Sequence, residues 1–461
     1  MFYFFSSLRD KVFYLLKSYT YNADLNEPIQ VYFCCVIRKD MLHLIFNSEM
    51  YSMTDKIEVL DKLCGSGKSA SLFKWIRENQ QERYLYVTPL LSEIEVRLPN
   101  EIPDMVFYQP KATYLGNYEK QTKAEHLLLL LTEGVNVAFT HALFKSMRKE
   151  HLHFIKQQGY IVIVDEECDL IESASDYIKS GDIEFLLAEK CIEIDTENLG
   201  IVKWIKEDAP RKDWKYAQIR GLAEMDMLYA SKRRHEMLTI HLPIKLITAA
   251  RRFILSSYMF DGSIMSSFVA MKGVTTTHFT GFSLCDKEHK KSIIGLIKIF
   301  HPRNEKELDK LSLSVHGSVT LKANSKQLSI LNKAMRNVAL YHNVKSDKVM
   351  WTCQKGLVDS KHIKPIGLPK DVCFVSCNAR ATNDYANKTV LIHAFDRYPN
   401  QVIRSYLEDY GFPIDSDRYA LAEIVQWVFR SAVRKGEQIN VCIMAKRMRE
   451  LFVKWLNSYF T

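Results

Sequence analysis

The chain has 461 residues, of which 47% are hydrophobic and 25% are charged, a balance typical of a soluble globular protein. That length is too great for one compact core and suits two domains of ordinary size. The formal net charge of +9 favours a polyanionic partner, although many enzymes without one are equally basic. The absence of any run of about 18 apolar residues excludes a transmembrane helix.

The start of the chain is aromatic but soon broken by charge, and it lacks the order of basic, apolar and small residues of a signal peptide. None of the 10 cysteines falls in a Cys-x-x-Cys pair, and Cys373 and Cys377 have no second ligand pair nearby. Because structural zinc usually needs clustered ligands, we expect reduced thiols. The sequence therefore predicts a cytoplasmic protein without a membrane partner.

Residues 1–52 carry two short apolar runs, at 32–37 and 42–46, that suit strands, but no recognisable motif. Two interpretations stay open: an N-terminal extension that packs on the core, or a natural start at Met53. From Met53 onward, short apolar strands alternate with helices, which indicates a mostly parallel sheet covered on both faces. We expect strands at 57–63, 84–90, 135–140 and 160–167, and helices at 71–79 and 123–134.

Residues 172–242 are charged, and we expect them to form a helical elaboration of the first domain. The boundary signals that follow are weak. A second set of apolar strands is expected in the last part of the chain, at 349–354, 372–376, 389–395 and 439–445. The sequence therefore predicts a first domain at 53–265 and a second at 266–461.

A glycine-rich loop lies between the expected strand at 57–63 and the helix after it, which is the context that a phosphate-binding loop requires. Its backbone amides point at negative charge from a helix start. Lys68 is expected to reach the β- and γ-phosphates of ATP, and the Ser69 hydroxyl to bind Mg²⁺. One departure from the full pattern is Lys62, which stands where a small residue is usual. The candidate nucleotide-binding residues are Gly65, Ser66, Gly67, Lys68 and Ser69.

A second candidate is the apolar strand at 160–167, which ends in three acidic residues. Adjacent carboxylates at the end of a buried strand are costly unless a cation or hydrogen bonds satisfy them. We expect Asp165 to hold Mg²⁺ through water and Glu166 to activate the attacking water. Together with the glycine-rich loop, these acids predict an ATPase.

The segment Asp165–Cys168 resembles the DEAD/DEAH-type box of superfamily 2 helicases. Between the two ATP motifs, Thr88 and Pro89 resemble the strand-end motif that grips a nucleic-acid backbone in that superfamily. Thr140 and His141 resemble the next backbone-contacting motif. Hydroxyl and amide donors at strand ends suit phosphate contacts that carry no sequence information. The order of the motifs, rather than any single one, carries the resemblance.

Two segments resemble the serine/threonine motif that couples hydrolysis to domain movement in this superfamily. One is Phe253–Tyr258 and the other is Leu246–Ala250. Further on, the segment 378–385 precedes an apolar strand, and the resemblance implies nucleic-acid contacts from Arg380 and Asn383.

The last motif comprises Gln426, Arg430 and Arg434, which resemble the glutamine and two arginines that face ATP from the second domain of these helicases. An arginine there balances charge on the transferring phosphate. Arginines four residues apart lie on one helical face, so both are expected to point into the cleft. The usual spacing is one residue shorter, which leaves either arginine as the finger. The second-domain motifs, with the segment 446–451, are closest to helicase-like proteins of bacteriophage genomes.

This resemblance, from Met53 to the end of the chain, implies an α/β protein with two RecA-like domains in tandem and an ATP site in the interdomain cleft. It implies a helicase or translocase that uses ATP and Mg²⁺ in the host cytoplasm, in phage replication or recombination. Single-stranded DNA is the expected partner, with RNA as the alternative and other replication or recombination proteins as further partners. The competing hypothesis is an ATPase motor that moves a non-nucleic-acid partner or packages DNA.

Overall fold

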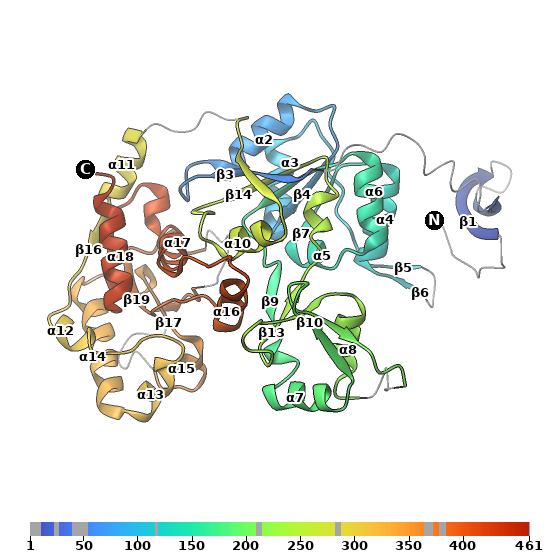
Figure 1. Ribbon diagram of the computed structural model, residues 1–461. Coiled ribbons are helices and arrows are strands. Elements are labelled where there is room, and N and C mark those ends of the chain that lie inside the picture. Colours follow the sequence, from blue (N-terminus) through green and yellow to red (C-terminus); the bar gives the residue numbers. More distant parts are fainter. Residues whose placement is uncertain are drawn as a thin grey trace.

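The computed structural model of the chain describes residues 11–22, 27–38, 54–115, 119–208, 214–281, 287–363, 372–377 and 384–460. Figure 1 shows two α/β domains side by side, with a smaller sheet next to the first. The predicted fold class, two RecA-like domains in tandem, is confirmed. None of the described helices combines the length and apolar character that crossing a bilayer requires.

Ahead of the first domain, β1 (Lys11–Asn22) and β2 (Glu27–Arg38) pair as an antiparallel ladder. The strand expected at 32–37 lies within β2. The apolar run at 42–46 lies outside the described residues.

The first domain is built on a parallel sheet with the strand order β15-β3-β14-β8-β4-β7. The residues of β8 show that both faces are covered, because Val162 and Val164 lie in one core and Ile161 and Ile163 in the core on the opposite face. The strands are β3 (Lys56–Asp61), β4 (Tyr84–Thr88), β7 (Val137–Thr140), β8 (Ile161–Asp165), β14 (Arg252–Ser257) and β15 (Thr275–His278). The α-helices are α2 (Lys68–Glu78), α3 (Leu98–Glu101), α4 (Lys123–Glu133), α5 (His141–Lys145), α6 (Lys149–Gln158), α9 (Lys245–Thr248) and α10 (Ile264–Met271).

Local sequence sets the ends of the two helices predicted in this domain. At the start of α4, the Thr122 side chain accepts from the Glu125 amide, and the Glu125 carboxylate accepts from the Thr122 amide. The helix stops at Gly134, which adopts the left-handed conformation with φ of 69°. Helix α2 begins directly after Gly67, which places its first turn at the carboxyl end of β3.

Residues 171–241 form a separate antiparallel sheet with the order β10-β11-β12-β13-β9. The prediction of a helical elaboration at 172–242 is therefore wrong, although α7 (Ser180–Ala188) and α8 (Ala217–Glu224) are helical. Burial explains the difference, since the strands supply a core of their own, and such packing outweighs local helix propensity. The strands are β9 (Ile171–Ser173), β10 (Ile192–Asp195), β11 (Ile201–Trp204), β12 (Leu228–Ala230) and β13 (Leu238–His241).

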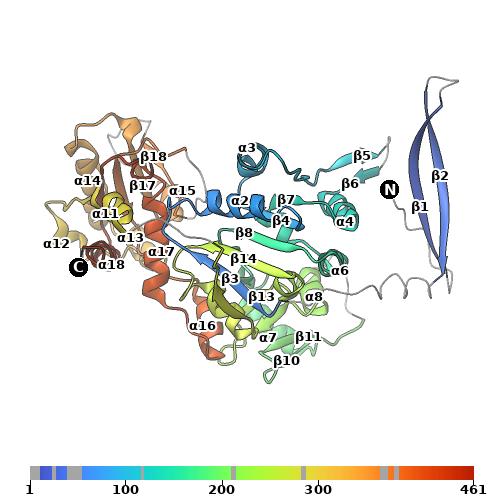
Figure 2. The same cartoon turned by 90° about the horizontal axis from the view of Figure 1, so that it is seen from above.

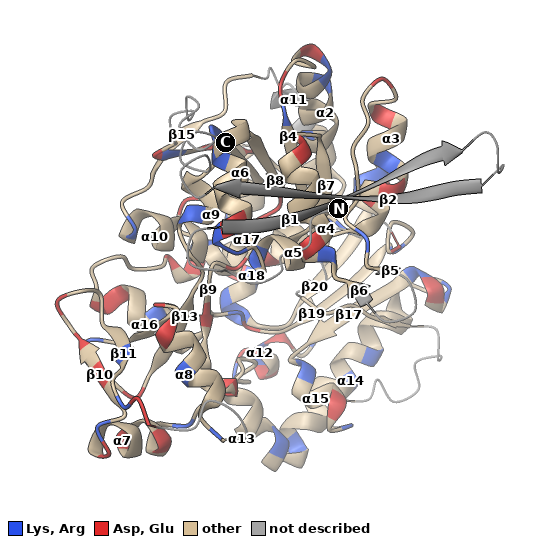
Figure 3. Ribbon diagram, turned by 90° about the vertical axis from the view of Figure 1, so that its right-hand side faces the viewer, with Lys and Arg blue, Asp and Glu red and all other residues tan. Residues whose placement is uncertain are grey.

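The second domain carries a parallel sheet with the order β16-β20-β19-β17-β18. In Figure 3, its strands lie beside α14 and α15. The strands are β16 (Ile297–Ile299), β17 (Val349–Cys353), β18 (Cys373–Phe374), β19 (Val390–Ala394) and β20 (Ile439–Ile443). The α-helices are α11 (Lys287–Gly295), α12 (Glu305–Leu308), α13 (Gly317–Ala323), α14 (Ser325–Tyr341), α15 (Lys355–Asp359), α16 (Gln401–Asp409), α17 (Ser416–Val428) and α18 (Lys446–Asn457).

The first domain extends beyond the predicted boundary between residues 265 and 266. Strand β15 pairs in parallel with β3, and Met265 and Phe268 of α10 are buried in the core of the first domain. The sequence after β14 contains no clear linker, so the predicted boundary lies ahead of the true end of the first domain. The second parallel sheet begins only at β16.

Helix α16 comes from the second half of the chain but packs on the first. Its residues Ile403, Tyr406 and Leu407 are buried in a core of the first domain. The Tyr406 hydroxyl donates to the carbonyl oxygen of Leu199 at 2.7 Å. Figures 1 and 2 both show α16 between the second domain and the antiparallel sheet. The helix therefore anchors the two halves of the molecule to each other.

We predict that Tyr406→Ala destabilises the protein by about 3–5 kcal/mol, because it removes a fully buried aromatic ring from this contact. Tyr406→Phe is the matched control and should cost only about 1 kcal/mol, the value of one buried hydrogen bond. Urea unfolding followed by tryptophan fluorescence measures both changes. A cost for the alanine variant no larger than that for the phenylalanine variant would contradict the anchoring role of α16.

Candidate active site in the interdomain cleft

A cleft of about 620 Å³ lies between the two parallel sheets and is lined by residues of both domains. The first domain contributes the glycine-rich loop and the ends of β8 and β14, and the second domain contributes α17 and the segment after it. In the part of the chain that the structure describes, the ATP-site residues predicted from sequence meet in this cleft. Ser66 is the exception, since it adjoins the lining residues without being one of them.

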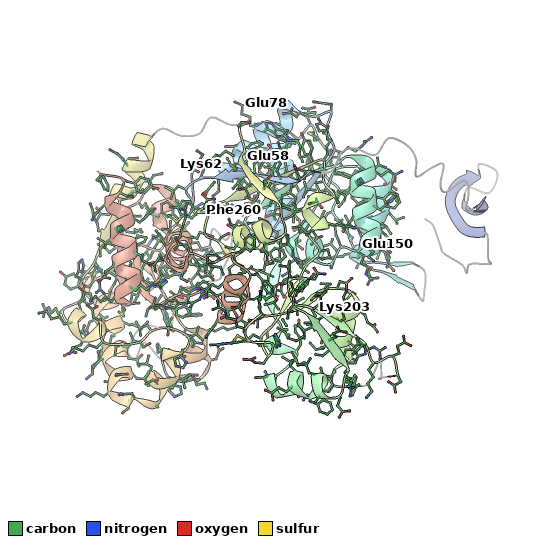
Figure 4. The ribbon with its side chains drawn as sticks, in the orientation of Figure 1. Glu58, Lys62, Glu78, Glu150, Lys203 and Phe260 are labelled. Carbon is green, nitrogen blue, oxygen red and sulfur yellow. The ribbon has the colours of Figure 1, made fainter. Side chains whose placement is uncertain are left out.

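The glycine-rich loop adopts a backbone that depends on its glycines. Gly65 and Gly67 have φ of 77° and 80°, in the left-handed region that residues with a Cβ atom rarely adopt. The Lys68 ammonium group donates to the carbonyl oxygen of Lys62 at 2.8 Å. Lys62, labelled in Figure 4, directly follows β3 and thus contributes its backbone rather than its side chain to the loop. Lys68 is the first residue of α2, and anions bind favourably at a helix N-terminus.

The Asp165 carboxylate is held at the end of β8 by two hydroxyl groups. Its Oδ2 atom accepts from Ser69 Oγ at 2.9 Å and from the Tyr86 hydroxyl at 3.3 Å. Tyr86 is fully buried, and its pKa is raised well above the usual value by that burial and by the neighbouring Asp165 charge. The Tyr86 hydroxyl therefore stays protonated and donates a hydrogen bond to the Asp165 carboxylate.

The donor set fits Mg²⁺. Magnesium is usually held by one or two carboxylates together with water and substrate phosphates, rather than by an all-protein cage. Ser69 and Asp165 bring two oxygen ligands together in the cleft. The described residues contain no group of three or more His, Cys, Asp or Glu side chains arranged to hold a metal ion, in the cleft or outside it, so water and phosphate would have to complete the coordination.

Glu166, which lines the cleft, has an uncommon backbone conformation. Its φ of 67° lies in the left-handed region, which costs a residue with a Cβ atom about 1 kcal/mol or more. The Glu166 amide donates to the carbonyl oxygen of Ser256 on the neighbouring strand at 3.0 Å, which fixes this turn. The strained backbone turns the chain at the end of β8, where Glu166 lines the cleft.

The two segments that resemble the serine/threonine motif lie in different places, and only Phe253–Tyr258, which includes strand β14, contributes residues to the cleft. Within Phe253–Tyr258, Ser256 pairs in register with Asp165, and Ser257 donates its hydroxyl to Glu167. The alternative segment, Leu246–Ala250, lies in the core of the first domain and does not line the cleft.

The second domain places its two arginines differently from the prediction. Helix α17 ends at Val428, so Arg430 lies in the turn after it and Arg434 in a 3-10 helix (Ala432–Lys435). The prediction that both lie on one helical face is therefore wrong. The helix ends before Arg430, and the Ser431 hydroxyl donates to the Val428 carbonyl at this end, at 2.6 Å. Both arginines nevertheless line the cleft.

Arg434 and Arg430 differ in their surroundings. A Cβ atom added to Gly65 would lie 3.8 Å from Cγ of Arg434, so this exposed arginine lies close to the phosphate loop. Arg430 is only 7% exposed, and its Nη1 atom has no hydrogen-bond partner among the described residues. Burial lowers the pKa of Arg430, while Glu166 and Glu423 oppose that shift.

The candidate nucleic-acid residues that the structure describes lie at the carboxyl ends of β4 and β7, where Thr88 and Thr140 are the last residues of the strands. Thr88 is fully buried, whereas Pro89 and Thr140 are half-buried. The His141 ring lies 3.0 Å from the Asp165 carbonyl oxygen, and because a carbonyl only accepts, this contact requires the Nε2-protonated tautomer. Arg380 and Asn383 lie outside the described residues.

Tyr86 is one of the site residues that the sequence motifs do not indicate. It looks like any apolar strand position. One feature of the sequence does indicate Tyr86. It lies two residues before Thr88 on β4, and residues two apart share a face of a strand. Glu93 and Arg97, which pair at 3.1 Å on a π-helical turn (Glu93–Arg97), also line the cleft and were missed.

Comparison with known proteins gives one relative along most of the chain. It is a prophage-derived protein, the SPbeta uncharacterized protein YonV of Bacillus subtilis (strain 168), with 26% identity over 429 residues. The match covers 88% of this chain and 99% of the relative. The predicted likeness to phage proteins is confirmed. The family model for the YonV C-terminal Rossmann-like domain matches residues 291–456, which include all five strands of the second parallel sheet.

Two solved structures also match. The structure of S. tokodaii Xpd4 gives a TM-score of 0.45 at 13% identity and covers 87% of this chain and 94% of that chain. The DUF1998 helicase MrfA, bound to DNA and AMPPNP, gives a TM-score of 0.27 at 10% identity, covering 88% of this chain and 48% of that chain. Similarity at this level carries no functional argument, so the resemblance to superfamily 2 helicases rests on the motifs and on their meeting in one cleft.

We predict that Tyr86→Phe raises the Mg²⁺ concentration needed for half-maximal nucleotide binding by about 10-fold, because removal of an outer partner of a metal-binding carboxylate typically has this effect. Titration of Mg²⁺ against a fluorescent ADP analogue measures the shift. Tyr84→Phe is the matched control, since Tyr84 lies on the same strand but donates to the Asn79 carbonyl, away from the cleft. Equal shifts in the two variants would show that Tyr86 does not position Asp165.

Proposed function

We propose that this protein hydrolyses ATP in the interdomain cleft and uses the cycle to move along or unwind a nucleic-acid strand. The observation that carries the proposal is the meeting, in one cleft, of the phosphate loop and Asp165 from the first domain with Arg430 from the second. A site divided between two domains makes hydrolysis depend on their relative position, as a motor requires.

The chain's own residues suggest how hydrolysis proceeds. Lys68 and the loop amides bind the phosphates, and Ser69 and Asp165 hold the metal, which neutralises charge on the phosphate oxygens when bound. Glu166 orients the attacking water and accepts its proton. Arg430, which is buried with an unpaired Nη1 atom, stabilises the charge on the transferring phosphate once the cleft closes.

Nucleic acid is the partner that best fits the remaining features. The strands β4 and β7 pair in parallel and end next to each other, and the half-buried Pro89 and Thr140 lie at these ends. Backbone amides and the Thr140 hydroxyl suit phosphate contacts there, whereas the fully buried Thr88 side chain supports the strand end from inside. Single-stranded DNA is the proposed track, with RNA as the alternative. The prophage-derived relative fits a phage setting. Within that setting, the proposed role is in the replication or recombination of a phage genome in the host cytoplasm, with other replication or recombination proteins as partners.

ATP hydrolysis with single-stranded DNA, single-stranded RNA, duplex DNA or no polymer tests the proposal. We expect one polymer to stimulate hydrolysis strongly, and Lys68→Ala and Glu166→Gln each to reduce the stimulated rate by at least about 100-fold, because they remove a phosphate contact and the general base. Hydrolysis that ignores every nucleic acid would overturn the motor proposal and favour an ATPase that moves another partner.

We further predict that Arg430→Ala lowers the hydrolysis rate by about 1,000-fold with little loss of ATP affinity, because an arginine finger acts mainly on the transition state. Arg434→Ala is expected to weaken ATP binding more than it slows hydrolysis, since Arg434 is exposed beside Gly65. Steady-state rates and equilibrium binding of the two variants separate these effects. The opposite pattern would assign the finger to Arg434.

A further inference from the structure

The second domain carries most of the chain's excess positive charge on a short stretch. Residues 310–361 contain nine Lys and Arg and only two Asp, with no Glu, against a net charge of +9 for the whole chain. Helix α14 contains no acidic residue at all, and its basic positions are drawn in blue in Figure 3. Charge this concentrated requires an explanation from its surroundings.

The cations of α14 lie on one face of the helix. Lys326, Lys333 and Arg336 are exposed at spacings of seven and three residues, which places them in one stripe along the helix axis. Ten residues of helix separate the first from the last, a length of about 15 Å. That length matches several successive phosphates of a nucleic-acid strand.

These cations are not neutralised by the protein. Among the described residues, neither an ion pair nor a hydrogen bond involves the side chain of Lys326, Lys333 or Arg336. Other surface helices differ, since α2 pairs Lys74 with Glu78 and α18 pairs Lys446 with Glu450. The stripe of α14 is therefore open to an external anion.

The opposite face of α14 limits the kinds of molecule that could carry this anion. It is apolar and buried in the core of the second domain, so it is not available to enter a lipid bilayer as the apolar face of a membrane-surface helix would. The large apolar side chains that α14 exposes, Leu340 and Tyr341, lie at its C-terminal end rather than along the stripe, so the stripe suits a phosphate backbone better than a lipid surface. The buried face consists of Leu328, Leu331, Ala334, Met335, Val338 and Ala339.

We infer that the stripe of Lys326, Lys333 and Arg336 is a second nucleic-acid contact, outside the ATP cleft, that binds backbone phosphates without reading sequence. The choice of nucleic acid among polyanions rests on the proposed function. None of the three residues lines the cleft, so the stripe holds the polymer independently of nucleotide. Such a contact keeps the motor on its track while the cleft opens.

The test compares two triple variants of the full chain in the absence of ATP. Lys326→Gln, Lys333→Gln and Arg336→Gln together remove the stripe. Lys74→Gln, Lys203→Gln and Lys446→Gln together make the same change in net charge at lysines that pair with acids elsewhere. Lys203, labelled in Figure 4, lies on β11 of the antiparallel sheet. Anisotropy of a labelled single-stranded oligonucleotide and of its duplex, at several salt concentrations, gives affinity and salt dependence.

We expect the stripe variant to bind at least about 10-fold more weakly, with a log–log salt slope reduced by about 2 for the single strand and about 3 for the duplex. The control variant should keep the slope of the native chain. Equal losses in both variants, or none in the stripe variant, would overturn the inference. A third outcome would also overturn it. The native chain and the control variant would bind phosphatidylserine vesicles, and the stripe variant would lose that binding but keep its affinity for nucleic acid. Stripe-dependent binding without stimulated hydrolysis would retain the inference and reject the proposed motor.

Discussion

The register of three neighbouring parallel strands is the constraint on which the cleft depends. Strand β14 lies between β3 and β8, and it aligns Ser256 with Asp165 and Ser257 with Asp61. A shift of one residue would turn Asp165 to the other face of the sheet and break its bond to Ser69. Asp61 adds a second lock, because its carboxylate accepts from the amides of Met259 and Phe260 at 2.8 and 3.0 Å. The loops that carry the chemistry therefore start from fixed positions.

The parts of this site that could be predicted from sequence are those in which a local motif dictates its own backbone. The phosphate loop and Asp165 belong to this class, since a glycine conformation and a strand end are properties of short segments. Tyr86 does not, because its contact with Asp165 exists only through the pairing of β4 with β8. The antiparallel sheet was missed for a similar reason, as its strands of three or four residues are stabilised by a distant partner rather than by their own propensity.

The two arginines show how a tertiary contact redirects a periodic pattern. Helical spacing from Gln426 suggested one continuous face, but the chain after Val428 turns, which buries Arg430 and leaves Arg434 exposed. A buried guanidinium is costly unless an anion compensates it. Two carboxylates supply part of that compensation: Glu166 from the first domain, on the other side of the cleft, and Glu423 from α17 of the second domain. The unpaired Nη1 atom is the part left for a ligand, so the cost of burying Arg430 makes its side of the cleft selective for a bound anion.

Helix α16 constrains how such a cleft moves. Full separation of the two domains would expose Ile403, Tyr406 and Leu407 to water, and each large apolar side chain contributes about 1.5–3 kcal/mol when buried. It would also break the contacts that Asp409 makes with the Ser231 hydroxyl and the Arg233 amide. A rotation that keeps α16 in place avoids both costs and still carries α17 and Arg430 toward or away from the phosphate loop. The segment after α16 stays with the first domain as well, since Ile414 is buried in the same core and the Pro413 carbonyl accepts from the Ser267 hydroxyl at 3.1 Å. The geometry thus favours a pivot over a gap, and a rotation of the second domain about α16 would carry the basic stripe of α14 with it.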